Sequence, residues 1–366
     1  MKKHLHILLF CTLTLCTFIG CSSNEPAQPK DYFTLWNQCE ALTALQEYVT
    51  DVTNPNSANF IAESDRIATF DMDGTFIGEL YPTYFEYNLL EYRVLDDTAY
   101  RDKAPEDVLE TAQQIRDFVR NGAKLPDHFD MKHAQAAAKA YAGMTIEELY
   151  DYAVEFGQKN TDSFQNMRYI DGFYLPMVEV VKYLYDNDFT IYVVSGTERT
   201  TTRAIVANSP ISEYVSPAHV IGTEFEVKQR GYEDVPSNMD YKYADGDDLV
   251  FTGGFIQKNL NANKSIWIER EIGTRPVLAF GNSGSDTSMM NYVLDDRNPY
   301  PSQAYMVVAD DDVREWGTQD WDEKSAAYTE QGYVPISMKN DFVRIYPDTV
   351  MRSDEQYVEQ ELEDAA

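Results

Sequence analysis

The chain has 366 residues and a formal net charge of −31 at neutral pH, so its surface repels nucleic acid and anionic membrane surfaces. A chain of this length is long enough for a sheet domain and a second, smaller domain. The same negative surface repels phosphate. A phosphate site in this chain would therefore need local positive charge from a metal ion, from lysine or arginine, or from backbone amides.

The first twenty residues have the features of a secretory signal peptide. Two lysines precede an apolar run at residues 5–19, which is too short for a comfortable membrane span. Residues 18–21 (FIGC) resemble a bacterial lipobox, in which the cysteine becomes the lipidated first residue, although Phe18 stands where leucine is common. We therefore expect a signal peptide at residues 1–20, a lipid anchor on Cys21 and an extracytoplasmic, membrane-anchored location. The alternative is an ordinary cleaved signal that happens to contain Cys21.

Residues 21–31 are polar and contain proline, which predicts a flexible tether. Removal of residues 1–20 takes away two lysines and no acids, so the net charge changes from −31 to about −33. Beyond Cys21 the only remaining cysteine is Cys39, which has no partner for an intrachain disulfide. We expect Cys39 to be buried and inert.

The first helix and the first strand follow the tether. Residues 32–52 have helical spacing, and a turn cluster at 53–59 ends the helix. Residues 67–70 are apolar and β-prone and stop at Asp71 and Asp73, as a buried strand does where it leads into a functional loop. Both aspartates should point beyond the carboxyl end of this strand, where open α/β sheets bind ligands. Two carboxylates this close need a cation, hydrogen-bond donors or a shared proton; the alternative is a plain Asp-Gly turn.

No strand is expected for the next hundred residues. Helical patterns instead follow one another at 86–95, 105–120, 132–141, 145–156 and 175–185. A helical insertion directly after a candidate catalytic strand indicates a lid, so we expect a helical cap at residues 82–187. His128 and His133 should lie on a solvated loop and helix start.

Sheet character then returns and continues to the end of the chain. A strand at 189–194 leads into Ser195 and Gly196, and a helix is expected at 199–207. Residues 220–252 alternate like strands around a polar loop at 236–248, which indicates a hairpin. The remaining expected elements are a helix at 263–272 and strands at 276–280, 305–308, 334–338 and 342–345. The catalytic core should comprise residues 32–81 and 188–350, and residues 351–366 should form a frayed acidic tail.

Four short motifs stand in order at the ends of successive strands. They are residues 71–75 (DMDGT), residues 195–197 (SGT), a lysine before the next αβ unit, and residues 281–286 (GNSGSD). Over residues 36–347 this order resembles the haloacid dehalogenase-like superfamily of phosphatases and phosphotransferases, especially secreted members and, more distantly, phosphoserine phosphatases. The resemblance implies an α/β fold with a Rossmann-like parallel sheet and a helical cap of the C1 type inserted after the first strand.

The resemblance also implies catalytic roles. Asp71 would attack phosphorus and become an aspartyl phosphate, and Asp73 would protonate the leaving alkoxide and then deprotonate water. The Ser195 hydroxyl and the Gly196 amide would contact a phosphoryl oxygen. Lys264 begins a helix at the position where the family places its lysine, so we prefer it to Lys258, which we expect to be a solvated loop charge.

The resemblance implies Mg²⁺ as the cofactor. Its ligands would be Asp71, the backbone carbonyl of Asp73, and Asp286, the last directly or through water. Asn282 stands where many relatives carry a metal-binding aspartate. An amide oxygen can bind Mg²⁺ but adds no charge, so we expect weaker metal binding. The metal would act as a Lewis acid and a template.

Candidate substrate contacts are fewer. Glu79 lies eight residues after Asp71, one position away from the glutamate with which phosphoserine phosphatases meet the ammonium of their substrate; the alternative is a linker acid at the cap hinge. Arg199 is a candidate anion contact. Arg168 is either a cap-side substrate contact or, as we prefer, a surface ion-pair residue.

Together these observations favour a Mg²⁺-dependent hydrolase of a small phosphorylated metabolite that works through an aspartyl phosphate. One alternative is a phosphotransferase or phosphomutase on the same fold, with a sugar hydroxyl as acceptor. The other is a catalytically retired binding lipoprotein, which only the replacement at Asn282 supports. The sequence specifies no oligomeric state.

Overall fold

The computed structural model describes residues 31–79, 82–236 and 239–356. The expected signal peptide and Cys21, the expected site of the lipid anchor, lie outside this part of the chain, as do residues 357–366 of the expected tail. No helix within the described ranges is long and apolar enough to cross a membrane.

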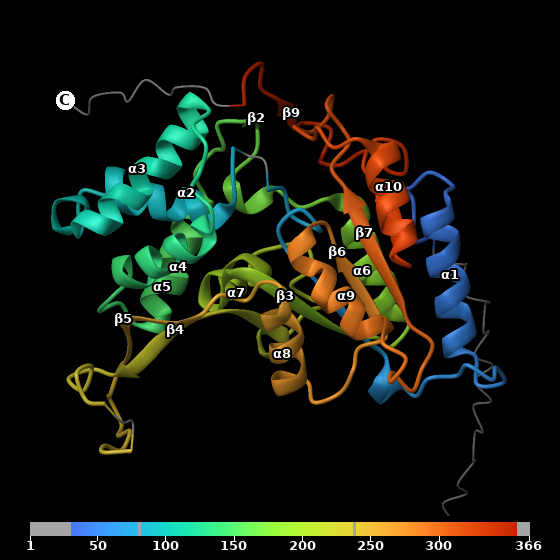
Figure 1. Cartoon of the computed structure of the whole chain (residues 1–366), viewed down its shortest axis with the longest axis horizontal. Coiled ribbons are helices and arrows are strands. Elements are labelled where there is room, and N and C mark those ends of the chain that lie inside the picture. Colours follow the sequence, from blue (N-terminus) through green and yellow to red (C-terminus); the bar gives the residue numbers. More distant parts are fainter. Residues whose placement is uncertain (1–30, 80–81, 237–238, 357–366) are drawn as a thin grey trace, which may run out of the picture. The chain divides into compact units, whose positions relative to one another are not determined.

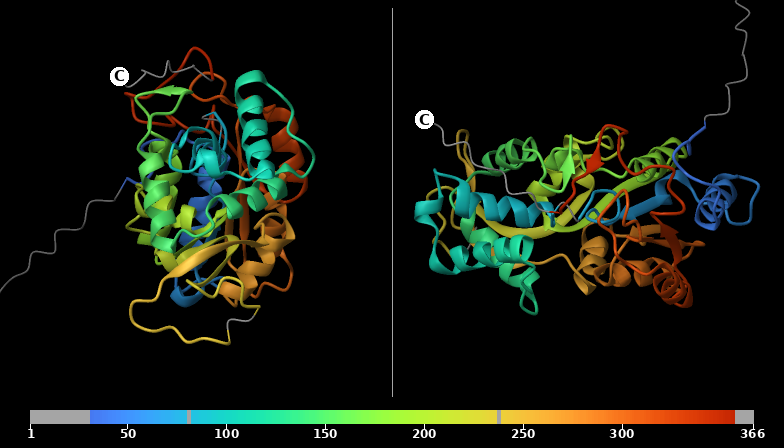
Figure 2. Two further views of the ribbon diagram at one scale, coloured as in Figure 1. Left: turned by 90° about the vertical axis from the view of Figure 1, so that its left-hand side faces the viewer. Right: turned by 90° about the horizontal axis from the view of Figure 1, so that it is seen from above.

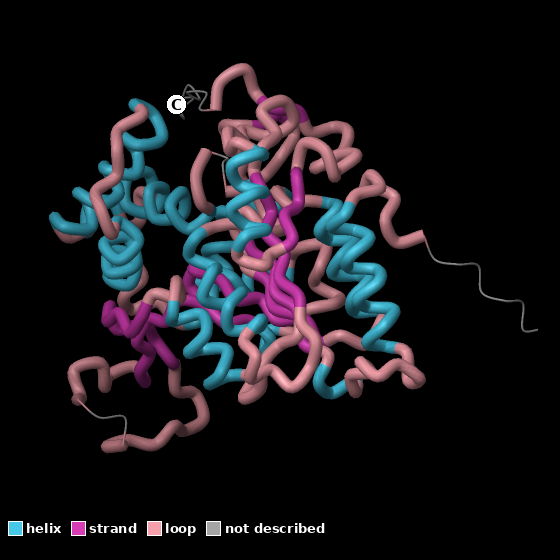
Figure 3. Tube along the Cα trace, turned by 45° about the vertical axis from the view of Figure 1, so that its right-hand side comes forward, coloured by secondary structure: helices cyan, strands magenta, loops and turns pink. Residues whose placement is uncertain are grey.

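A seven-stranded sheet in the order β5-β4-β3-β1-β6-β7-β8 forms the centre of the fold (Figures 1 and 3). All neighbouring strands are parallel except the β4–β5 pair, which is antiparallel. The Rossmann-like sheet expected from the sequence is therefore confirmed. The strand bounds are β1 Ile67–Phe70, β3 Thr190–Glu198, β4 Val220–Gln229, β5 Leu249–Gln257, β6 Leu278–Gly281, β7 Gln303–Val308 and β8 Val334–Ser337.

Helices cover both faces of this sheet (Figures 1 and 2). On one face lie α6 (Leu175–Asp186) and α7 (Arg199–Ala207); on the other lie α8 (Ala262–Glu271), α9 (Thr287–Leu294) and α10 (Trp321–Glu330). The chain moves from β1 outward to β3 and β4, and α8 then carries it across to β6 on the other side of β1. Because parallel connections are right-handed, this reversal places the later helices on the opposite face.

Burial on both faces explains why the central strands have continuous apolar sequences. All four residues of β1 and all four of β6 are buried. Phe70, Phe280 and Tyr305 stack across β1, β6 and β7, with ring centroids 4.3 Å and 4.8 Å apart. This apolar layer lies directly before the polar ends of the strands and fixes their position.

Four helices stand at one end of the sheet between β1 and α6. They are α2 (Phe85–Glu91), which continues as a π-helical turn at Tyr92–Asp96, α3 (Glu106–Asn121), α4 (Phe129–Ala140) and α5 (Ile146–Gly157). This group, here called the cap helices, rests on the β4–β5 hairpin (Figure 1). Backbone hydrogen bonds join Gly143 N to Phe251 O at 2.7 Å and Phe251 N to Met144 O at 2.9 Å. The helix α6, in contrast, packs against β3 in the layers of the core.

Several expected elements differ from the structure. Residues 342–345 form no strand: Phe342 makes only an isolated bridge to Trp36 and packs edge-on against its ring. The start of the expected tail is ordered instead of frayed, because β9 (Met351–Arg352) pairs antiparallel with β2 (Phe164–Gln165). The sequence patterns missed α9 and α10.

The first helix, α1 (Glu40–Thr53), begins eight residues later than expected. Cys39 is its N-cap, and Cys39 Sγ accepts a hydrogen bond from Leu42 N at 3.4 Å. Burial raises the pKa of the Cys39 thiol to about 11. The thiol is therefore protonated and unreactive at neutral pH, as expected, although the residue is only partly buried.

Candidate active site

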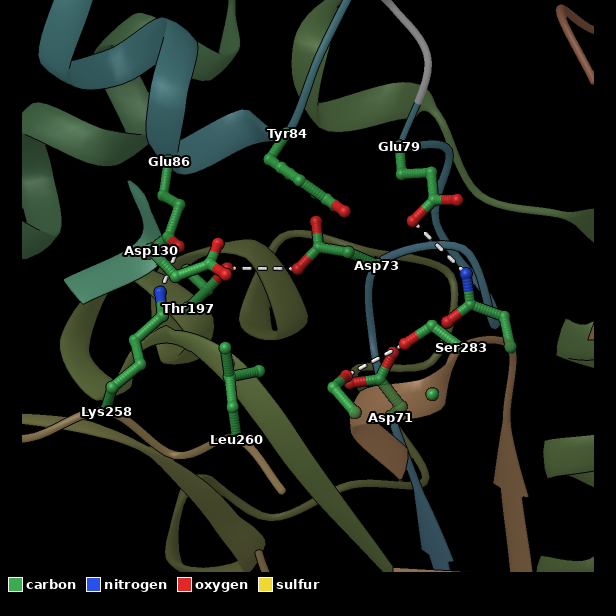
Figure 4. A pocket seen from close by; sticks show the side chains of 14 residues that line it. Asp71, Asp73, Glu79, Tyr84, Glu86, Asp130, Thr197, Lys258, Leu260 and Ser283 are labelled. Carbon is green, nitrogen blue, oxygen red and sulfur yellow. Dashed lines mark hydrogen bonds and ion pairs between the residues drawn. The ribbon is translucent and has the colours of Figure 1, made fainter. Parts of the chain in front are cut away.

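The carboxyl ends of β1, β3 and β6 meet the cap helices around a cavity of about 240 Å³ (Figure 4). The strand order reverses at β1, and ligands of open α/β sheets bind at such a point. The core side of the cavity carries Asp71, Asp73, Glu79 and Asn282, and the cap side carries Tyr84, Glu86 and Asp130. The two aspartates predicted from the first motif are therefore brought together at one cavity.

Lys264 forms a buried ion pair with Asp71. Lys264 Nζ donates to Asp71 Oδ1, to Asp286 Oδ1 at 2.7 Å and to Val194 O at 2.8 Å, and the lysine side chain is fully buried. The structure thus places Lys264, the preferred third-motif lysine, beside the candidate nucleophile. Burial and the nearby Asp286 raise the pKa of Asp71, whereas Lys264 opposes the rise.

Asp286 supports the site from outside the cavity. Its Oδ2 accepts from the backbone N–H groups of Asn282 and Ser283, both at 3.1 Å, and its Oδ1 accepts from Lys264. Asp286 is fully buried and does not line the cavity. Both of its oxygens accept hydrogen bonds from the protein, so Asp286 positions Lys264 and the backbone of the fourth motif, and its expected role towards a metal ion stays a prediction.

Asp73 faces the cavity with one free oxygen (Figure 4). Asp73 Oδ2 accepts from Thr197 Oγ1 at 3.0 Å, while the buried Oδ1 has no hydrogen-bond partner. Burial, together with the charges of Asp71 and Glu86, raises the pKa of Asp73 to about 8. A carboxyl group that keeps its proton at neutral pH can act as a general acid.

Gly74 makes the turn that brings this loop close to the fourth motif. Its φ of +79° is in the left-handed region that glycine favours. A Cβ at this position would lie 1.9 Å from Asn282 Nδ2 and 2.8 Å from Glu79 Oε2. The first-motif turn, Asn282 and Glu79 therefore converge at one point of the cavity wall.

The second motif lies on a bulged part of β3. The pairing of β3 with β4 shifts register between Val194 and Glu198. Ser195 is fully buried and its Oγ accepts from Thr197 N at 3.0 Å, whereas Gly196 and Thr197 line the cavity. Asn259 Nδ2 donates to Ser195 O at 3.0 Å and holds the bulge in place. The structure thus brings Gly196, but not the Ser195 side chain, to the cavity wall.

Lys258 corrects one expectation. It is not a solvated charge: it is 5% exposed, lines the cavity and donates to Glu86 Oε1 at 2.6 Å. This ion pair joins the core loop after β5 to α2 of the cap helices. His133, expected near solvent, is also buried, and its Nε2 lies 3.2 Å from Glu86 O. Burial lowers the pKa of His133 to about 4, so the imidazole is neutral.

The two candidate arginines lie away from the cavity lining. Arg199 Nη2 pairs with Glu271 at 2.9 Å, and its Nε also contacts Glu224. Arg199 does not line this cavity, so the structure gives no support to a substrate contact. Arg168 forms the surface ion pair that we preferred, with Nε 2.6 Å from Asp171 Oδ2.

The donor set around Asp71 suits a hard divalent cation. The cavity offers the Asp71 carboxylate and the Asn282 side chain. At the same wall, the buried Asp73 Oδ1 has no hydrogen-bond partner. Within the part of the chain that the structure describes, no three His, Cys, Asp or Glu side chains are grouped to hold a metal ion. A cation here would therefore use a backbone carbonyl and an amide oxygen beside its carboxylates.

Sequence reasoning gave no role to five residues that line or support the cavity, and it placed Lys258 in solvent. The five are Thr197, Asn259, Tyr84, Glu86 and Asp130. Thr197 carried a signal, because it closes the SGT motif at the end of a strand. The others contact groups far away in the sequence, such as Lys258 and Glu86, so no local pattern marks them.

Comparisons with known proteins agree with this geometry. A family model described as haloacid dehalogenase-like hydrolase matches residues 68–291. A conserved protein of unknown function from Anaerococcus prevotii DSM 20548 is similar in structure, with a TM-score of 0.53 and 13% identity over 84% of this chain and 94% of that chain. At this identity the likeness shows the fold alone.

Two further solved structures are less similar. Cytosolic 5′-nucleotidase IIIB bound to cytidine has a TM-score of 0.46 and 12% identity over 87% of this chain and 91% of that chain. A phosphoserine phosphohydrolase-like protein from Francisella tularensis subsp. tularensis SCHU S4 has a TM-score of 0.34 and 13% identity over 67% and 88%. No curated protein sequence matches the chain.

Proposed function

Because the chain belongs to the haloacid dehalogenase-like hydrolase family, we propose that it is a Mg²⁺-dependent phosphomonoesterase that works through an aspartyl phosphate. One observation supports this most directly. Asp71 and Asp73 face one cavity, yet Asp71 is paired with a buried lysine, whereas Asp73 has no charged partner, accepts only from the Thr197 hydroxyl and has the higher pKa of the two, about 8 against about 7. Two carboxyl groups in environments this different suit a nucleophile and a general acid.

Asp71 begins the reaction. Its carboxylate oxygen attacks phosphorus, the bond from phosphorus to the ester oxygen breaks, and a covalent aspartyl phosphate forms. Lys264 holds Asp71 Oδ1, which fixes the carboxylate, and Oδ2, which accepts only a long hydrogen bond of 3.4 Å from Thr75 Oγ1, would make the attack. The Gly196 amide lies at the wall where a phosphoryl oxygen would accept a hydrogen bond.

Asp73 acts first as the general acid and then as the general base. Its protonated carboxyl group donates to the leaving alkoxide, and the resulting carboxylate then takes a proton from the water that hydrolyses the aspartyl phosphate. Thr197 orients this carboxyl group through the hydrogen bond to Oδ2. A divalent cation held by Asp71, the Asp73 carbonyl and Asn282 would neutralise charge on the transferring phosphoryl group.

The proposed substrate is a small phosphorylated metabolite. A cavity of about 240 Å³ has room for a small ester and not for a polymer. Within the described residues the cap side contributes the acids Glu86 and Asp130 to the wall, and the basic side chain of the lining, Lys258 on the core loop after β5, is already bonded to Glu86. We propose an extracytoplasmic location with a lipid anchor on Cys21; a Cys21→Ala variant that no longer incorporates labelled palmitate would support it.

The test measures phosphate release by residues 22–366 with Mg²⁺. The panel holds phosphoserine, phosphocholine, phosphoethanolamine, sugar phosphates and p-nitrophenyl phosphate, and Asp71→Asn serves as the control after its fold is checked by circular dichroism. We expect turnover that needs the metal and disappears in Asp71→Asn. Products formed with competing alcohols distinguish hydrolysis from transfer to a sugar hydroxyl. Absence of turnover and transfer on every ester would favour the retired binding lipoprotein.

A further inference from the structure

We propose that Glu79 supplies the second carboxylate of the divalent-cation site, in place of the acid that Asn282 lacks. This inference rests on the proposed function only in needing a cation at the end of β1. It assigns Glu79 to the metal and not to an ammonium group of the substrate.

The position of Glu79 carries the proposal. Asn282 is 4% exposed, and its Nδ2 donates to Glu79 Oε2 at 3.2 Å (Figure 4). The same carboxylate oxygen would lie 2.8 Å from a Cβ on Gly74, so it closes directly over the turn that follows Asp73. Glu79 therefore contacts the residue at the expected ligand position and lies against the turn whose carbonyl is expected to be another ligand.

The net charge around the site also favours Glu79 as a ligand of the cation. Asp71 and Asp286 contribute two negative charges, and the buried ammonium of Lys264 between them removes one. With Asp73 protonated as the general acid, a single net negative charge is left for a divalent cation, because Asn282 is neutral. The Glu79 carboxyl group, ionised when a cation binds against it, raises this to two and supplies the carboxylate missing from the fourth motif.

Nothing else in the described structure neutralises Glu79. It forms no ion pair there, and the cation of the cavity wall, Lys258, is bonded to Glu86 on the cap side. Asp286, in contrast, does not line the cavity and is paired there with Lys264 and with the Asn282 and Ser283 amides. Of the acids on the core side, Asp71 is already paired with Lys264 and Asp73 is assigned to proton transfer, so Glu79 is the carboxylate left for the cation.

The proposal is tested by metal binding without substrate. The dissociation constant of Mg²⁺ is measured calorimetrically on residues 22–366, with Mn²⁺ as a second probe. The variants are Glu79→Gln, Asn282→Asp and the double variant, and Asp130→Asn is the matched control because it removes a carboxylate from the cap wall of the same cavity. Glu79→Gln keeps an oxygen that can accept from Asn282, so only the charge is lost. Unfolding temperatures in EDTA verify that each variant folds.

We expect Glu79→Gln to weaken Mg²⁺ binding by about 10- to 100-fold, the range seen when groups that support a metal site are removed. In the double variant Asn282→Asp should restore affinity to within about threefold of wild type, because the charge count is the same. Asp130→Asn should bind as wild type does.

Two results would overturn the proposal. One is unchanged Mg²⁺ affinity in Glu79→Gln, with a raised KM only for esters that carry an ammonium group, which would assign Glu79 to the substrate. The other is a loss of affinity that Asn282→Asp does not restore. If the wild type itself binds no divalent cation, the Mg²⁺ dependence of the proposed function fails as well, so the two failures are distinguishable.

Discussion

Lys264 and Asp286 form a fully buried ion pair, with Nζ and Oδ1 2.7 Å apart and neither side chain exposed to solvent. Asp71 contacts the same ammonium. Because two carboxylates share one buried cation, the lysine stabilises the fold and also keeps the candidate nucleophile in place.

This arrangement predicts that Lys264→Met destabilises the protein by about 3–5 kcal/mol, since two buried acids lose their cation. The free energy of unfolding is measured by urea denaturation in EDTA at pH 7. Asp286→Asn added to Lys264→Met should recover part of the loss, because one of the unpaired charges is removed. A double variant as unstable as the single one would show that packing, and not charge, explains the effect.

The Thr197 hydroxyl should set the pH range of catalysis. Its hydrogen bond to Asp73 favours the ionised carboxylate, so Thr197→Val should raise the pKa of Asp73 above its value of about 8. In the wild type, kcat/KM should fall as the pH rises through about 8, because the general acid loses its proton. In Thr197→Val this fall should move upward by about one pH unit. Thr197→Ser keeps the hydroxyl and should leave the profile in place.

Lys258 and Glu86 should be energetically coupled across the contact between core and cap. Both side chains are largely buried, and their atoms are 2.6 Å apart. A double-mutant cycle with Lys258→Met and Glu86→Gln should give a coupling of about 0.5–3 kcal/mol in the free energy of unfolding. The exposed pair Arg101–Asp102, 3.7 Å apart, is the control and should give about 0.5 kcal/mol or less. Equal coupling in the two pairs would contradict the assignment of Lys258 to a buried contact.

Glu315, which lies outside the active site, should make the stability of the protein depend on pH. It is fully buried, its Oε1 has no partner, and burial raises its pKa to about 7. Between pH 4.5 and 7 the folded state keeps this proton while the unfolded chain releases it, so stability falls as the pH rises. Glu315→Gln removes this titration. The free energy of unfolding of the variant, relative to wild type, should therefore rise by roughly 1–3 kcal/mol as the pH is raised from 5 to 8. The free energies of unfolding of wild type and variant are measured by chemical denaturation at pH 5 and at pH 8. An equal difference between the two proteins at both pH values would contradict the prediction.

The sequence predicts the parts of this fold that local patterns determine. The helix expected at 199–207 has these bounds in α7, and the strands before Asp71 and Gly281 end near their expected positions because an apolar run stops at turn and acidic residues. The pair Asp71 and Asp73 was predictable from the side-chain alternation of a strand.

The remaining differences come from long-range contacts. Lys258 is buried because Glu86, 172 residues away, neutralises it. Asp286 lies under the cavity because the amides of its own turn and Lys264 take both of its oxygens. The helix α9 was missed because it has only eight residues and follows a glycine- and serine-rich motif that reads as a loop. The strand expected at 342–345 does not form, and Phe342 instead makes an isolated bridge to Trp36 and packs on its ring.

The backbone pairing of Met144 and Gly143 with Phe251 also bears on how fast substrate exchanges. The cap helices are connected to the core through the chain after β1, through the chain that leads into α6 and through the edge strand β5. A lid held at both sides cannot swing freely about one hinge, so the whole group should move only together with the hairpin. We therefore expect turnover to depend little on solvent viscosity, with product leaving past cap helices that move only with the hairpin.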